Sequence, residues 1–104
     1  MNQQSQSGKK YDLPLNVEKE IVNYAKNNAI KKVVLFGSRA RCTNSERSDI
    51  DIAVYGGNFD SFYFDIKENV NSLLMFDIVE ANKRISEELE NEIKKDGVVI
   101  YEKA

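Results

Sequence analysis

The stretch that decides the fold is VVLFGSRAR, residues 33–41. Its first four residues form an uninterrupted apolar run, which is typical of a strand covered on both faces. Gly37 ends the run, and a short helical turn is expected through residues 39–41. A glycine here lets the backbone approach a ligand closely, and the free N–H groups of the turn attract phosphate. Taken alone, Gly37 and Ser38 are weak evidence of a site, and an ordinary turn is the simpler explanation for them.

The second informative stretch is SDIDIAVY, residues 48–55, in which polar and apolar residues alternate. This period of two predicts a strand with isoleucine and valine on one face and Asp49 and Asp51 on the other. The two carboxylates are then within reach of one ion. Mg²⁺ prefers a few carboxylates together with phosphate oxygens. A solvated strand face remains an alternative explanation for the pair.

A third acid, Asp77, lies between Phe76 and Ile78 in another apolar run. An acid in such a strand is costly unless it faces solvent or a site. If this strand neighbours the first acidic strand, three carboxylates converge. Without a metal they repel one another and their pKa values rise. The alternative is an edge-strand acid that blunts aggregation.

Apolar spacing predicts the remaining elements. A helix is expected from about residue 14 to 27, another helix from 59, a helix over 86–95 and a last strand over 98–101. The second helix has a buried stripe and directs two aromatic residues, Tyr63 and Phe64, towards its flank or outer surface. We therefore expect an α/β (α+β) fold, a small mixed sheet with helices packed on one face. Residues 1–12 are expected to be a flexible leader, and residues 13–104 one domain. The buried stripe of the second helix, which begins at residue 59, consists of Phe59, Phe62, Ile66, Val70 and Leu73.

Composition excludes several classes of function. The chain has 104 residues, a size typical of one domain, and its net charge of −2 does not favour nucleic acid as a partner. No apolar run is long enough to span a membrane. The single cysteine excludes an internal disulfide and fits a cytoplasmic location. With no histidine, catalysis must depend on carboxylates, lysines, tyrosines and metals.

The order and spacing of these features are more specific than any one of them. GSRAR at residues 37–41 and SDIDIA at residues 48–53 resemble the signature of the polymerase-beta-type nucleotidyltransferase superfamily. The resemblance is strongest to its minimal branch, the antitoxins encoded beside HEPN-domain toxins. It extends from about Leu15 to Tyr101.

The resemblance implies a fold, an activity and a site. Gly37 and Ser38 would hold the triphosphate of ATP, and Asp49 and Asp51 would bind Mg²⁺, with two ions expected. Asp77 would complete the metal site and help to deprotonate the attacking hydroxyl. The reaction would transfer AMP to a hydroxyl acceptor, namely a tyrosine of a HEPN ribonuclease toxin, so that the chain acts as an antitoxin.

For three further residues the sequence leaves two alternatives open. Arg39 is expected to contact phosphate, and Arg41 is a weaker candidate; surface ion pairs are the alternative for both. Cys42 stands where the family usually has glycine. If that position needs a positive φ, cysteine is strained there, whereas a helical backbone would make the change cheap.

Two other functions remain open. The chain could neutralise a toxin by contact alone, with the site vestigial. The outward aromatic residues Tyr63 and Phe64 could contact a partner or a second copy, although core packing explains most of that segment. Drug-modifying and polymerase roles need more structure than 104 residues supply.

Overall fold

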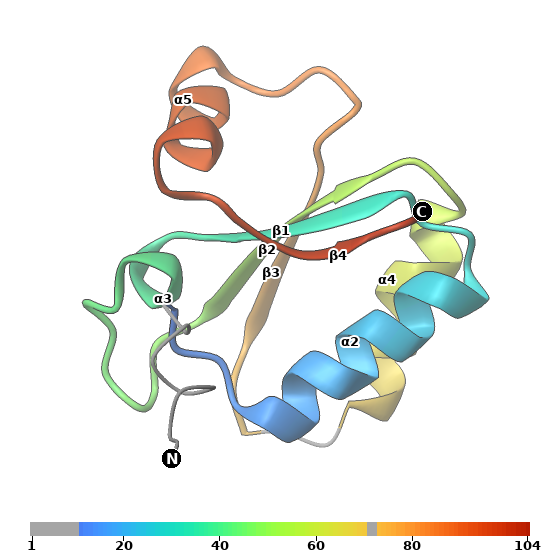
Figure 1. Ribbon diagram of the computed structural model, residues 1–104, viewed down its shortest axis with the longest axis horizontal. Helices are drawn as coiled ribbons and strands as arrows, with labels where there is room; N and C mark the ends of the chain where they lie inside the picture. The colour runs from blue at the N-terminus through green and yellow to red at the C-terminus, as the bar shows by residue number, and fades with distance from the viewer. Residues whose placement is uncertain (1–10, 71–72) are drawn as a thin grey trace.

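The computed structural model describes residues 11–70 and 73–104. Figure 1 shows a twisted four-stranded sheet with the order β3-β2-β1-β4 and helices on both sides. The elements follow one another as α2 (Leu15–Asn27), β1 (Lys32–Phe36), α3 (Ser38–Arg41), β2 (Ile50–Tyr55), α4 (Phe59–Asn69), β3 (Phe76–Glu80), α5 (Glu87–Asp96) and β4 (Val98–Glu102). The predicted mixed sheet and the predicted order of elements are confirmed.

The directions of the strands bring three distant segments together. β1 runs antiparallel to β2, so the end of β1 meets the beginning of β2, where Phe36 pairs with Asp51. β2 runs parallel to β3, so the two strands begin side by side and Asp51 pairs with Asp77. A parallel pair needs a crossover connection, which α4 supplies. One corner of the sheet therefore collects the end of β1 and the starts of β2 and β3.

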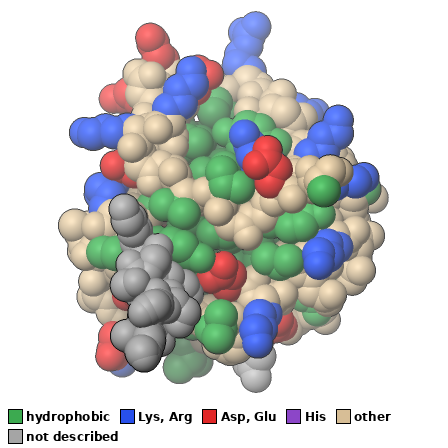
Figure 2. All heavy atoms as spheres, viewed as in Figure 1, with side chains coloured by type: hydrophobic (Ala, Val, Ile, Leu, Met, Phe, Trp, Pro, Cys, Tyr) green, Lys and Arg blue, Asp and Glu red, His purple; other side chains and the backbone are tan. Residues whose placement is uncertain are grey.

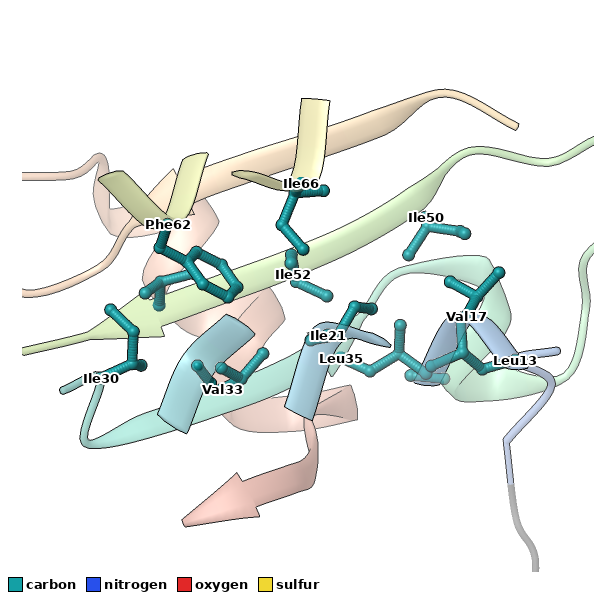
Figure 3. Close-up of a cluster of buried hydrophobic side chains, with 13 residues drawn as sticks. Leu13, Val17, Ile21, Ile30, Val33, Leu35, Ile50, Ile52, Phe62 and Ile66 are labelled. Atoms are coloured by element: carbon teal, nitrogen blue, oxygen red, sulfur yellow. The ribbon is translucent and has the colours of Figure 1, made fainter. Parts of the chain in front are cut away.

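The main core lies between the sheet and the helices α2 and α4. Val17, Ile21 and Ala25 recur at helical spacing along α2 and are all buried. From α4, Phe62 and Ile66 point into the same core, where Figure 3 shows them beside the apolar side chains of β1 and β2. This packing accounts for the alternation in β2, because its apolar face belongs to this core.

The opposite face of the sheet carries α5. Ile93 of this helix packs against Val34, Phe36 and Ala53, and Figure 1 shows α5 across the sheet from α2 and α4. The expectation that the helices pack on one face is therefore wrong for α5. The physical reason lies in β1, whose apolar run projects side chains to both faces, and each face needs a cover.

Two expected boundaries also differ. α4 ends at Asn69, and Leu73 lies beyond the helix with its side chain fully exposed. At the N-terminus, residues 1–10 of the expected leader lie outside the described residues. Tyr11 and Asp12 are attached to the domain: the Tyr11 hydroxyl donates to Glu18 at 2.8 Å, and the Asp12 N–H donates to the Arg39 carbonyl at 2.9 Å. Burial, followed by the bond to Glu18, raises the pKa of Tyr11 to about 12.

Charges of both signs are spread over the surface. On the face shown in Figure 2, Lys and Arg side chains lie mostly along the rim, Asp and Glu side chains lie both at the rim and towards the centre, and apolar side chains gather in the middle. This distribution agrees with the net charge of −2. Across the described ranges, no helix combines the length and the apolar character needed to cross a bilayer.

Candidate active site

Gly37 sits directly against the carboxylate of Asp51. Its backbone has φ 77° and ψ −158°, a conformation that is essentially restricted to glycine. A Cβ added at this position would collide with the Asp51 Oδ2. The Gly37 carbonyl then accepts from the N–H groups of Ala40 and Arg41, at 3.1 and 3.2 Å, and this starts α3. Both the conformation and the close approach therefore require glycine here.

The three predicted acids lie at the same corner. Asp51 and Asp77 are direct partners in the parallel pairing of β2 and β3. Asp49 precedes β2 and is exposed, as is Asp77, whereas Asp51 is half-buried. Burial raises the pKa of Asp51 from 3.8 to about 6, and the nearby charges of Asp77 and Asp49 act in the same direction. The expected mutual repulsion is thus present at Asp51.

The donor chemistry of this corner suits a hard divalent cation, because carboxylate oxygens are the ligands that Mg²⁺ prefers. Within residues 11–70 and 73–104, however, no three acidic or cysteine side chains are arranged to hold a metal ion. The corner therefore supplies suitable ligands at neighbouring positions and not a finished coordination shell. Repulsion between like charges is the physical reason for carboxylates to stay apart without a cation.

Arg39 does not occupy the position expected of a phosphate ligand. Its side chain is buried, with 2% of the residue exposed. Its Nε, Nη1 and Nη2 atoms donate to the backbone carbonyls of Ser48, Asp12 and Glu46, each at 3.0 Å. The guanidinium therefore ties the loop before β2 to the chain entering α2. Neither a phosphate contact nor a surface ion pair describes Arg39, whose role in the fold is structural.

Arg41, in contrast, forms the surface ion pair that was the alternative expected for it. Its side chain is 41% exposed, and its Nη1 donates to Asp96 Oδ2 at 3.0 Å. Arg41 lowers the pKa of Asp51, whereas Glu92 of α5 raises it. The last turn of α5 therefore borders the acidic corner. Sequence reasoning missed Glu92 and Asp96, since no local pattern connects α5 with a turn that lies far earlier in the chain.

Cys42 has φ 60° and ψ 34°, the left-handed conformation that commonly ends a helix. Its side chain is exposed. Of the two alternatives left open for this position, the positive φ is the observed one. Cysteine at this position is therefore strained relative to glycine.

A hollow in the surface lies on α4, away from the acidic corner. An apolar hollow of about 380 Å³ on α4 is lined by Phe59, Asp60, Tyr63 and Phe64. It lies on the α4 side of the sheet, whereas Asp51 faces the α5 side. The acidic corner is distinguished by its chemistry, and the hollow on α4 is a separate surface.

A glycine-serine turn beside paired strand carboxylates, on a small mixed sheet, defines a domain suited to binding a metal and a phosphorylated ligand. The sequence comparisons give the family. Residues 19–104 match the family described as polymerase beta nucleotidyltransferase. The chain belongs to this family of transferases.

One relative comes from Methanocaldococcus jannaschii and is named as a candidate protein adenylyltransferase. It is 33% identical over 93 residues, covering 80% of this chain and 93% of the relative.

Solved structures share the fold. A toxin–antitoxin crystal structure with AMP-PNP aligns with a TM-score of 0.62 and 21% identity, over 83% of this chain and 73% of the other. A mutant of the toxin–antitoxin MntA-HpeT aligns with a TM-score of 0.65 and 21% identity, over the same shares. At this level of identity the likeness concerns the fold alone.

Proposed function

We propose that this chain transfers AMP from ATP to a hydroxyl group of a partner protein, with Mg²⁺, and thereby acts as an antitoxin. The proposed acceptor is a tyrosine of a HEPN-domain toxin, and the proposed location is the cytoplasm. The observation that carries the proposal is the corner where Gly37, Asp51 and Asp77 meet. Support also comes from the relative named for protein adenylylation and from the fold shared with toxin–antitoxin structures.

The residues divide into two groups by chemistry. The turn of Gly37 and Ser38 would receive the triphosphate, since the glycine brings the backbone close to the ligand without steric obstruction. Asp49, Asp51 and Asp77 would hold the cation. When bound, Mg²⁺ would neutralise charge on the phosphates and on these carboxylates. Arg41, which replaces Arg39 in this role, is exposed beside the same turn and would contact phosphate oxygens.

The proposed reaction is a displacement at the α-phosphorus of ATP. The acceptor oxygen forms a bond to this phosphorus, and the bond from the phosphorus to the oxygen bridging to the β-phosphate breaks. Pyrophosphate leaves with the electron pair, and AMP stays on the acceptor. The hydroxyl proton passes to Asp77 and then to solvent. Such a transfer depends mainly on positioning and charge neutralisation, so the lack of histidine is no obstacle.

Calorimetric titration of ATP with Mg²⁺ tests the site. The wild-type protein should bind ATP only when Mg²⁺ is present, and Asp51→Asn should weaken this binding at least about tenfold. Asp60→Asn is the matched control, because Asp60 is an exposed aspartate on α4. Equal binding by wild type and Asp51→Asn would overturn the proposed metal site. Incorporation of labelled AMP into a co-expressed toxin then tests the acceptor.

A contact-only antitoxin is the second candidate. The exposed aromatic residues Tyr63 and Phe64, with 40% and 65% of their surface accessible, offer a contact surface that does not involve the acidic corner. If Asp51→Asn still neutralised the toxin in cells as well as wild type, contact would be the mechanism. If neutralisation were lost while complex formation persisted, transfer would be the mechanism.

A further inference from the structure

The end of α5 is joined to the end of α3 by an ion pair between residues far apart in the sequence. Arg41 Nη1 donates to Asp96 Oδ2 at 3.0 Å. The Asp96 side chain is only 16% exposed, whereas that of Arg41 is 41% exposed. The carboxylate is therefore shielded from solvent, and the guanidinium keeps an accessible side. Shielding makes such a pair less sensitive to salt than a fully exposed one.

Asp96 is held in place by the packing of α5. Ile93, one turn earlier, is buried against Val34, Phe36 and Ala53. The next residue, Gly97, donates its N–H to the Ile93 carbonyl at 2.8 Å. A Cβ on Gly97 would come within 2.7 Å of Val34 Cγ1, so the chain passes close to β1 there. Asp96 therefore lies on a fixed part of the fold. A residue that orients another side chain must itself be held in place in this way.

Arg41 belongs to the acidic corner as well as to this pair. Its charge favours the ionised form of Asp51, and the charge of Glu92 opposes that form. Its own N–H donates to Gly37, which lies against the Asp51 carboxylate. One side of the guanidinium is therefore held by Asp96, while the backbone of Arg41 belongs to the glycine turn and the charge of its side chain acts on Asp51.

We propose that Asp96 is a positioning residue, which holds the Arg41 guanidinium ready for the phosphates of the nucleotide; this inference rests on the proposed function. Arginine has many rotamers, and fixing one of them before the ligand arrives lowers the entropic cost of binding. Asp96 accepts a hydrogen bond only from Nη1 of Arg41. Among residues 11–70 and 73–104, Nε and Nη2 of Arg41 have no hydrogen-bond partner, so they can donate to a phosphate.

A double-mutant cycle on ATP binding with Mg²⁺ tests this inference. Asp96→Ala should raise the Kd for ATP about tenfold, Arg41→Ala should raise it by at least as much, and the double variant should bind no worse than Arg41→Ala. Asp96→Glu should recover part of the loss. In transfer assays the change should appear in KM and not in kcat. Loss of an acid from a helix C-terminus does not threaten folding, and thermal melting of Asp96→Ala verifies this.

Other results would overturn the inference. It fails if Asp96→Ala binds ATP as tightly as wild type or more tightly, or if the losses of the two single variants add in the double variant. Asp51→Asn in the same series separates the two proposals. If Asp51→Asn weakens binding and neither Arg41→Ala nor Asp96→Ala does, only the positioning role fails. If Asp51→Asn also binds normally, the proposed function fails.

Discussion

Asp51 and Asp77 are direct partners across the parallel pairing of β2 and β3, so their carboxylates share one face of the sheet. Asp51 is the half-buried member of the pair and the one whose pKa is raised to about 6. A carboxylate in such a place costs folding free energy when no cation is bound. Proteins often keep destabilising groups of this kind where function needs them.

We predict that Asp51→Asn stabilises the protein without metal at neutral pH. The folded pKa of about 6 lies above the ordinary 3.8. Protonation of Asp51 therefore stabilises the folded state relative to the unfolded chain. This stabilisation is complete below pH 4 and is lost as the pH rises through 6. The pKa shift alone corresponds to about 3 kcal/mol of folding free energy. Because Asp51 is only half-buried, screening reduces the expected gain at pH 7.5 to about 1 kcal/mol.

Urea denaturation at pH 7.5 and pH 4 measures this effect. Most of the gain should disappear at pH 4, where Asp51 is protonated in the folded state and partly protonated in the unfolded state. Glu68→Gln, an exposed acid-to-amide change on α4, should have little effect at either pH. An equal gain at both pH values would contradict the electrostatic explanation.

Gly37→Ala should abolish nucleotide binding and destabilise the fold by about 1–3 kcal/mol. The backbone conformation penalises any Cβ, and this Cβ would also meet the Asp51 carboxylate. The two causes can be separated by repeating the substitution in an Asp51→Ala background, where the collision partner is absent. The stability cost should then fall but not disappear. A full cost in both backgrounds would mean that backbone strain alone is responsible.

Cys42→Gly should stabilise the protein by about 1 kcal/mol, since it relieves a left-handed conformation at the end of α3. Cys42→Ala is the control, because it removes the thiol and keeps the strain. Thermal melting of the three proteins under reducing conditions gives the comparison. If alanine stabilises as much as glycine, the thiol and not the backbone is the source of the difference.

Arg39→Met should cost about 3 kcal/mol or more of folding free energy, because it leaves three backbone carbonyls without their donor. Arg39→Lys should recover only part of this, as an ammonium lacks the planar fork of guanidinium. Hydrogen exchange should show loosening of residues 44–48. A variant that kept wild-type stability and lost only ATP binding would restore the phosphate role for Arg39.

Two neighbouring aromatic residues of α4 should behave oppositely. Phe62 is fully buried, and Phe62→Ala should cost about 3–5 kcal/mol. Phe64 is 65% exposed, and Phe64→Ser should change stability by less than about 0.5 kcal/mol. If the outer face of α4 contacts a partner or a second copy, Phe64→Ser should weaken pull-down of the toxin or reduce the mass found by light scattering. Unchanged assembly would remove that contact surface.

The sequence by itself predicted the elements on which the candidate site residues lie. Alternation in residues 49–55 indicated that the apolar face of β2 points to the core and Asp51 away from it, and the structure agrees. The apolar run of β1 ending at Gly37 likewise located the turn. These features are local, because strand and helix periodicity are properties of consecutive residues.

The tertiary structure alone decided how those residues meet. The pairing of Asp51 with Asp77 depends on strand direction and register. The burial of Arg39 and the exposure of Arg41 depend on which backbone segments surround α3. The position of α5, which brings Asp96 to Arg41, follows from covering the second face of β1. Each is a contact between segments far apart in the chain, and no pattern of neighbouring residues specifies such contacts.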